Sequence, residues 1–429
     1  MLDRKIEKLI TDHLKSGADG ILLIEGARGV GKTTSVRRAC SELFDNIIEI
    51  NLLGDLNGRR SFADMHSAED FYLKLSLTAG DRLKSREDTL IFLDDIQAYP
   101  NVVDILDQLS SDGKFTFIAC GSGIEDANTS PAVRRVKMYP LDFEEFLYAN
   151  GIYGIAVEAM QKKFERLEPL DASEHEKIMD LFQRYLFVGG MPYAVTTYLK
   201  MRNIQAVRRA QTEISDLYRS AAGEHDRTAH TSCRKIFDLI AENMRRRKKR
   251  VRAREIENRA GAVFSDYRDD FMYLETAGVA LVCRALSDAP SSDCFAKEML
   301  KLYPNDVGIL SSVLFGNNIR AIYDDRRSVE LGSLYECAAA CELAAHGRRL
   351  FYYDVRNKGE CDLVARDEEG KYIPLRVKSG KDRVVYSAAG SLLANKSIDT
   401  GSSYVLSNDR EIRVRSGICY IPVYYVMFI

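Results

Sequence analysis

A glycine-rich segment near the start of the chain has the spacing of a phosphate-binding loop. Its residues read Gly-Ala-Arg-Gly-Val-Gly-Lys-Thr over 26–33 and match the pattern Gly-x-x-x-x-Gly-Lys-Ser/Thr. Glycines let the backbone turn tightly around a phosphate with its N–H groups pointing inward. We expect Lys32 to contact the β- and γ-phosphates, and Thr33 to offer its hydroxyl to Mg²⁺. The segment therefore predicts a site for ATP and Mg²⁺.

The predicted site covers the loop and the first turn of the helix that follows it. Its nucleotide-binding residues are Gly26, Ala27, Arg28, Gly29, Val30, Gly31, Lys32, Thr33 and Thr34. A buried strand is predicted over 20–25 and a helix over 32–44. A glycine-rich turn that binds nothing is the alternative interpretation, and the strand–loop–helix context argues against it.

Two acids end a second apolar strand, Thr89–Asp95. Asp94 stands where a Walker B acid would hold the water shell of Mg²⁺, so Thr33 and Asp94 are the predicted metal-site residues. Asp95 stands where hydrolytic ATPases usually have a glutamate that orients the attacking water. Aspartate is one methylene shorter, and a misplacement of about 1 Å can cost on the order of a hundredfold in rate. Either hydrolysis is slow or the loop geometry compensates.

Further candidates for catalysis follow the next strand, residues 115–120. Ser122 lies in a Cys-Gly-Ser-Gly turn and could contact the γ-phosphate or the attacking water. A plain turn is the alternative. Arg134 or Arg135 could be an arginine finger, acting in the same chain or from a neighbouring subunit. A solvated surface pair is the alternative for these two arginines.

The spacing of apolar runs predicts how these residues are positioned. Over the first 150 residues, continuous apolar strands alternate with helices, which predicts a parallel sheet covered on both faces. Ligands bind such sheets at the carboxyl ends of the strands. Residues 143–220 then turn helical, broken at Val-Gly-Gly-Met-Pro, 188–192. Three helical stretches and a strand over 229–285 are typical of a winged helix. The fold class is therefore α/β.

Composition excludes several classes of protein. The 429 residues carry a formal net charge of −2, so no global field draws the chain to nucleic acid. Nine cysteines without a Cys-x-x-Cys pair argue against a disulfide framework or zinc ribbon and fit a reducing cytoplasm. The mixed charges of residues 1–15 are unlike a signal peptide, and no apolar run is long enough to span a membrane. The six histidines lack metal-ligand spacing.

A basic run, Arg245–Arg254, has eight cations in ten residues. One interpretation is that this run contacts the phosphate backbone of DNA or RNA. The other is a solvated turn and helix face, balanced by Glu242, Glu255 and Glu257. Winged helices also bind proteins, so a protein partner is a third interpretation.

Several segments resemble a family of prokaryotic AAA+-type P-loop ATPases that is largely uncharacterised. They are Leu93–Pro100 (LDDIQAYP), Tyr139–Leu147 (YPLDFEEFL) and Tyr185–Pro192 (YLFVGGMP). The resemblance implies a P-loop core over 1–142, a helical lid over 143–226, a winged-helix region over 227–322 and a restriction-endonuclease-like domain over 323–429. It also implies ATP binding and hydrolysis. The family's Walker B sequence ends Asp-Glu-Ile-Gln, whereas this chain has Asp-Asp-Ile-Gln over 94–97.

The same resemblance implies a degenerate nuclease-like site near the C-terminus. The family pattern has a helix glutamate, then Glu-x-Asp, then Glu-x-Lys on the next strand. Glu336, Asp362 and Lys378 match it, but Arg376 replaces the second metal-binding acid. A guanidinium cannot bind a metal ion and stays charged. We expect no nuclease activity, and an Arg376 pair with Asp362 or Glu360 would mark a scaffold or binding surface.

Two functions remain open from the sequence. The first is a Mg²⁺-dependent ATPase that acts as a nucleotide-controlled switch, as related signalling ATPases do. The second is a nucleic-acid-binding factor in which ATP is a conformational clamp with little turnover. The sequence leaves the oligomeric state open.

Overall fold

The computed structural model describes 2–17, 20–54, 62, 65–86, 88–124, 132–226, 231–286, 300–324, 328–355, 359–367, 369–378 and 399–429. These residues form two compact units. The first unit contains Asp3–Met138 together with Thr276–Gly278, and the second contains Tyr139–Glu275 and Val279–Ile429. Within the described part of the chain, no helix is long and apolar enough to cross a membrane.

The first unit is built on a five-stranded parallel sheet with the order β2-β3-β4-β1-β5. Its strands are β1 (Ile21–Glu25), β2 (Asn46–Asn51), β3 (Thr89–Asp94), β4 (Thr116–Gly121) and β5 (Val133–Lys137). Every residue of β1 and of β3 is buried, as expected for a sheet covered on both faces. The parallel sheet predicted from the sequence is therefore confirmed.

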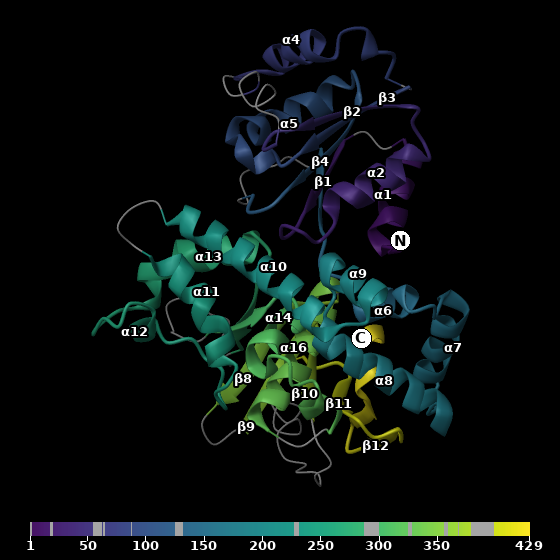
Figure 1. Cartoon of the computed structure of the whole chain (residues 1–429), viewed down its shortest axis with the longest axis vertical. Helices are drawn as coiled ribbons and strands as arrows, with labels where there is room; N and C mark the ends of the chain where they lie inside the picture. Colours follow the sequence, from purple (N-terminus) through teal and green to yellow (C-terminus); the bar gives the residue numbers. More distant parts are fainter. Residues whose placement is uncertain are drawn as a thin grey trace. The chain divides into compact units, whose positions relative to one another are not determined.

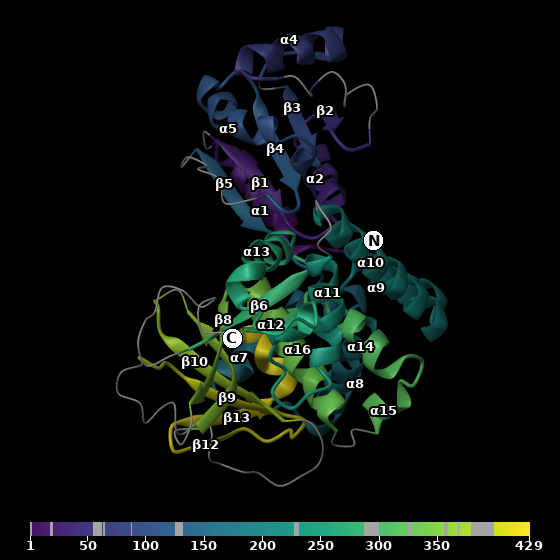
Figure 2. The same ribbon diagram turned by 90° about the vertical axis from the view of Figure 1, so that its left-hand side faces the viewer.

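Helices cover this sheet and fix the ends of its strands. They are α1 (Lys5–Lys15), α2 (Lys32–Ser41), α4 (Ala68–Ala79) and α5 (Pro100–Asp112). Leu23 of β1 shares a core with Phe71 of α4 and Leu106 of α5, while α2 covers the opposite face (Figures 1 and 2). Because β4 lies between β1 and β3, the loops after these three strands meet at one edge of the sheet.

The second unit begins with five helices. They are α6 (Phe143–Ala149), α7 (Gly154–Glu165), α8 (Ala172–Val188), α9 (Pro192–Met201) and α10 (Ile204–His225). Asp171 and Glu174 form a capping box at the start of α8. Between α8 and α9, a Cβ on Gly190 would lie 1.9 Å from the Leu141 carbonyl oxygen, so only glycine fits there. The Gly190 N–H donates to the buried Asp306 carboxylate at 2.6 Å.

The remaining elements alternate short helices with strands. The helices are α11 (Ser232–Asn243), α12 (Ala253–Ile256), α13 (Arg268–Thr276), α14 (Val307–Phe315), α15 (Arg320–Tyr323) and α16 (Val329–Ala345). The strands are β6 (Ala280–Ala285), β7 (Leu300–Pro304), β8 (Arg349–Val355), β9 (Gly359–Arg366), β10 (Tyr372–Val377), β11 (Ser403–Ser407), β12 (Arg413–Arg415) and β13 (Ile418–Pro422). The chain ends in a 3-10 helix, Val423–Phe428.

These strands form one eight-stranded sheet with the order β12-β13-β11-β10-β9-β8-β6-β7. The expected strand after the third helix of 229–285 is β6, and it pairs with β7 on one side and β8 on the other. The β6–β7 pair thus continues the sheet formed by β8 to β13. The family resemblance instead assigns β6 and β7 to the winged-helix region and β8 to β13 to a separate C-terminal domain. The division of this unit into lid, winged helix and C-terminal domain stays a prediction.

Candidate nucleotide site and a buried charge cluster

The predicted phosphate loop joins the end of β1 to the start of α2. Gly29 has φ 82° and Gly31 has φ 102°, left-handed values that favour glycine. Gly31 is the residue immediately before the first residue of α2, Lys32. The loop therefore leads into a helix N-terminus, where free N–H groups and the helix dipole favour a phosphate.

The Lys32 ammonium lies inside this loop. Its Nζ donates to the carbonyl oxygens of Gly26 at 2.8 Å and Ala27 at 3.0 Å. Burial lowers the Lys32 pKa, and the nearby Asp95 and Asp94 carboxylates act in the opposite direction. Phosphate oxygens at this position would also favour the charged ammonium, so the arrangement suits an anionic ligand.

Thr33 and Asp94 bring the two nucleotide motifs into direct contact. The Thr33 hydroxyl donates to Asp94 Oδ2 at 2.7 Å. The Asn51 amide, at the end of β2, lies 3.4 Å from the same oxygen. Burial raises the Asp94 pKa, and the Thr33 hydrogen bond opposes that shift. A hydroxyl and a carboxylate side by side suit Mg²⁺, which binds few protein oxygens and keeps several waters.

Asp95 follows β3 in a left-handed conformation, with φ 57°. Its Oδ1 accepts a hydrogen bond from Gln97 Nε2 at 3.0 Å. The Gln97 Oε1 in turn accepts from the Ser122 N–H at 3.1 Å. The structure therefore brings together the ends of β3 and β4, with Asp95 and Ser122 joined through one amide side chain. Neither Gln97 nor Asn51 was among the residues predicted for the site.

The two candidate arginine fingers lie on β5. Arg134 pairs in register with Leu22 of β1, three residues before the end of that strand. Arg135 makes a paired contact with the Glu25 carboxylate, at 2.8 and 2.5 Å. A finger role for Arg134 or Arg135, in the same chain or from a neighbouring subunit, stays a prediction.

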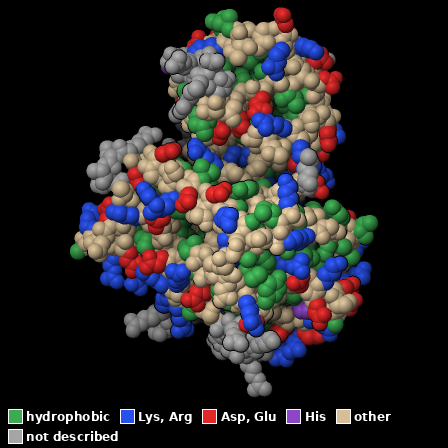
Figure 3. Space-filling view, viewed as in Figure 1, with side chains coloured by type: hydrophobic (Ala, Val, Ile, Leu, Met, Phe, Trp, Pro, Cys, Tyr) green, Lys and Arg blue, Asp and Glu red, His purple; other side chains and the backbone are tan. Residues whose placement is uncertain are grey.

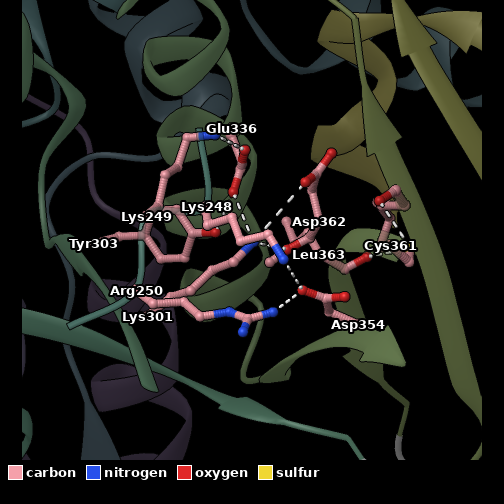
Figure 4. Close-up of polar contacts among 11 residues, drawn as sticks. Lys248, Lys249, Arg250, Lys301, Tyr303, Glu336, Asp354, Cys361, Asp362 and Leu363 are labelled. Atoms are coloured by element: carbon pink, nitrogen blue, oxygen red, sulfur yellow. Dashed lines mark hydrogen bonds and ion pairs between the residues drawn. The ribbon is translucent and has the colours of Figure 1, made fainter. Parts of the chain in front are cut away.

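Two of the predicted nuclease-like residues, Glu336 and Asp362, belong to an ion-pair cluster in the second unit (Figure 4). Glu336 of α16 accepts from the Tyr303 hydroxyl at 2.5 Å and pairs with Lys249 Nζ at 2.9 Å. Lys301 Nζ lies 3.5 Å from Glu336 and 4.0 Å from Asp362 Oδ1, and it donates to the Asp362 backbone oxygen at 3.0 Å. One ammonium thus contacts oxygens of both acids.

The two lysines determine the protonation of Glu336. Burial alone would raise the Glu336 pKa, but Lys301 and Lys249 outweigh burial and hold it below its ordinary value. Burial would likewise lower the Lys301 pKa, yet Glu336 and Asp362 hold it above its ordinary value. Lys301 therefore supplies positive charge to a carboxylate pair, where a nuclease would have a metal ion. The described residues contain no group of three or more metal-ligating side chains.

Arg376 does not take the part that the sequence suggested for it. The antiparallel pairing of β9 with β10 ends at Leu363 and Leu375, so Arg376 follows the last pair on the strand beside Asp362. Among the ion pairs of the described residues, the cation at Asp362 is Lys301, and none joins Arg376 to Asp362 or Glu360. Lys378 lies just beyond β10, where its N–H donates to Leu406. The signal that was missed is a lysine inside the apolar strand β7, because a buried lysine requires an acidic partner.

The basic run 245–254 is divided between internal ion pairs and solvent. Lys249 is buried with Glu336, and Lys248 and Arg250 pair with Asp354 (Figure 4). Arg246 pairs with Glu255 at 2.5 Å and with Glu242 at 3.6 Å, as the alternative interpretation of a balanced surface expected. The exposed cations of the run are Arg245, Arg247, Lys248, Arg252 and Arg254. Figure 3 shows Lys and Arg side chains gathered near α12, with acidic side chains among them.

Three family models match successive parts of the chain. Residues 18–147 match an AAA domain. Residues 179–319 and 331–426 match two different domains of unknown function, DUF8612 and DUF4143. A search of curated proteins finds no match.

Three solved structures resemble this chain at low sequence identity. A Walker-type ATPase of Pyrococcus abyssi is 14% identical with a TM-score of 0.43, over 72% of this chain and 95% of that one. The RuvB Holliday junction branch migration motor of Thermotoga maritima is 14% identical with a TM-score of 0.31, over 66% and 90%. A STAND signal transduction ATPase of Pyrococcus horikoshii is 14% identical with a TM-score of 0.29, over 80% and 45%.

The buried cluster gives a testable expectation for stability. Replacing Glu336 by glutamine keeps an acceptor for Tyr303 but leaves the buried Lys249 ammonium without its counter-charge. We expect the free energy of unfolding to fall by about 3–5 kcal/mol. Urea unfolding followed by circular dichroism measures it.

The control for this substitution is an exposed ion pair in the same sheet region. Glu369, whose side chain is 74% exposed, pairs with Lys371 at 2.7 Å. Glu369→Gln should leave the unfolding midpoint almost unchanged, because exposed pairs contribute little. An equal midpoint for Glu336→Gln and the unsubstituted protein would contradict a structural role for the cluster.

The geometry of the phosphate loop and the matched family model agree about the first unit. The loop, its lysine and the Thr33–Asp94 contact lie within residues 18–147. The chain therefore carries an AAA-type P-loop ATPase domain, and two later segments match families of unknown function.

Proposed function

We propose that this protein is a Mg²⁺-dependent ATPase whose nucleotide state acts as a conformational switch. The observation that carries the proposal is the 2.7 Å hydrogen bond from Thr33 to Asp94, which joins the phosphate loop to the acid at the end of β3. The buried Lys32 ammonium lies within the same loop. These are the groups that bind and polarise a triphosphate in P-loop enzymes.

Each group has a defined task in the proposed reaction. The backbone N–H groups of 26–31 and the Lys32 ammonium bind the β- and γ-phosphates. Thr33 and Asp94 would hold Mg²⁺ directly and through water, and this ion would neutralise charge on the phosphates. Asp95 orients the attacking water, and Ser122 contributes from the end of β4. The reaction is hydrolysis of the terminal phosphoanhydride of ATP.

Support for a switch comes from a short segment that begins with the last residue of α13. Thr276–Gly278 belongs to the first unit, whereas the rest of α13 and all of β6 belong to the second. The Gly123 N–H, one residue after Ser122, donates to the Thr276 carbonyl oxygen at 3.3 Å. A Cβ on Gly278 would lie 2.9 Å from the Ala27 backbone nitrogen, within the phosphate loop. A change in this loop on nucleotide binding would press on a segment that leads directly into α13 and β6.

Turnover is the first test of the proposal. The protein should release phosphate from ATP in a Mg²⁺-dependent manner, and Lys32→Ala should abolish that release because it removes the charge inside the loop. Lys8→Ala, on the exposed face of α1, is the matched control and should leave turnover unchanged. Equal phosphate release from the unsubstituted protein and from Lys32→Ala would exclude ATPase activity at this site.

Hydrogen exchange tests the switch separately. A non-hydrolysable ATP analogue with Mg²⁺ should change amide protection beyond residue 150, first in α13 and β6, because Thr276–Gly278 contacts the nucleotide loops. The Lys32→Ala variant with the same analogue is the control. If protection changed only within Asp3–Met138, the nucleotide would bind without switching the second unit.

A second candidate function, nucleic-acid binding with ATP as a clamp, is favoured by the exposed half of the basic run. Arg247, Arg252 and Arg254 have exposed side chains. Substituting these three by serine should reduce the slope of log affinity against log salt by about 3 for DNA or RNA. The same change at Lys162, Arg166 and Lys177, three exposed cations of the second unit, is the matched control. An unchanged slope for the Arg247, Arg252 and Arg254 variant would exclude these arginines from any contact with nucleic acid.

A further inference from the structure

Gln97 connects the two strand ends that flank the nucleotide site. It lies in a short 3-10 helix, Ile96–Ala98, directly after Asp95. Its Nε2 donates to Asp95 Oδ1 at 3.0 Å, and its Oε1 accepts from the Ser122 N–H at 3.1 Å. One neutral amide therefore uses its donor and its acceptor at once, between a side chain after β3 and the backbone after β4.

The hydrogen bond from Gln97 restrains the Asp95 side chain, whose backbone has a left-handed conformation. Asp95 has φ 57° and ψ 43°, so its side chain leaves the chain in a direction that few non-glycine residues adopt. The carboxylate can still rotate about two single bonds. A hydrogen bond to Oδ1 selects one rotamer, and because an amide carries no charge it leaves the negative charge of Asp95 in place.

The other end of Gln97 is accommodated by a glycine. A Cβ on Gly121, the last residue of β4, would lie 3.0 Å from Gln97 Oε1 and 2.5 Å from Ile124 Cδ1. Any larger residue at 121 would displace the amide that reaches Ser122. The end of β4 is therefore shaped around Gln97, independently of the Asp95 contact.

We propose that Gln97 is a positioning residue for ATP hydrolysis, fixing the Asp95 carboxylate relative to the end of β4. The proposal rests on the ATPase function proposed above. In the step concerned, the water oxygen bonds to the γ-phosphorus and the bond from that phosphorus to the β–γ bridging oxygen breaks. ADP leaves with that electron pair, and the water proton passes to Asp95 and then to solvent. Fixing Asp95 offsets the shorter reach of aspartate compared with glutamate.

Gln97→Leu tests this proposal, because leucine has a similar size and no hydrogen-bonding group. We expect kcat to fall by about tenfold to a hundredfold, as for a catalytic group displaced by part of an ångström. KM for ATP should stay unchanged, because the hydrogen bonds of Gln97 are with Asp95 and Ser122 and not with the phosphate loop. In an Asp95→Asn background, Gln97→Leu should have no further effect on kcat.

Gln97→Glu separates the two contacts of this side chain and serves as the second variant. It keeps an acceptor for Ser122 but places a second carboxylate beside Asp95. Repulsion between the two carboxylates should displace Asp95, so kcat should fall at least as far as in Gln97→Leu while KM for ATP stays unchanged. If Gln97 served only to hold the Ser122 backbone, Gln97→Glu would restore kcat to that of the unsubstituted protein.

Gln108→Leu is the matched control in the same unit. Gln108 of α5 accepts from the Ala68 N–H at 3.2 Å, so this variant also removes an amide that holds a backbone group. Its kcat should equal that of the unsubstituted protein. An unchanged kcat in Gln97→Leu, or an equal loss with and without Asp95, would overturn the positioning role while leaving the ATPase function intact. If the unsubstituted protein released phosphate no faster than Lys32→Ala, both the ATPase function and the positioning role would be overturned.

Discussion

The hydrogen bond between Thr33 and Asp94 depends on the order of strands in the first sheet. Thr33 begins a helix after β1, and Asp94 ends β3, with β4 between these strands. Parallel strands all present their carboxyl ends at one edge, so residues 61 positions apart meet there. The same edge holds Lys32, Asp95 and Ser122. Together with the left-handed glycines of the phosphate loop, this strand order assembles the site.

The buried charges around Glu336 in the second unit are paired with one another. In the first unit, a buried ammonium and a buried carboxylate lie beside a loop built for an anionic ligand. In the second, Lys301 contacts oxygens of Glu336 and Asp362, and Lys249 completes the pairing. The acids already have internal cations, and the cost of burying Glu336, Lys249 and Lys301 is offset by the attraction among these charges. This balance argues for a scaffold, by a route different from the arginine pair that the sequence suggested.

Local patterns were sufficient to predict the parallel sheet, the phosphate loop and the meeting of Thr33 with Asp94. Glycine spacing, apolar runs and the acids after a strand all act over a few residues. The partners of Glu336 were not predictable in this way, because Lys249 and Lys301 are 87 and 35 positions away in the sequence. The contact of Arg135 with Glu25 was not predictable for a similar reason, since it follows from the pairing of β5 with β1. The contacts of Gln97 depend on a loop conformation that no propensity specifies.

The aspartate at position 95 is best understood together with its neighbours. Replacing glutamate by aspartate withdraws the carboxylate by one methylene, which would by itself favour a clamp with little turnover. The left-handed backbone at Asp95 and the Gln97 amide both redirect and restrain that carboxylate. A restrained carboxylate loses less entropy on reaching the reactive geometry than a free one. The restraint on Asp95 therefore supports the proposed ATPase over a clamp with little turnover.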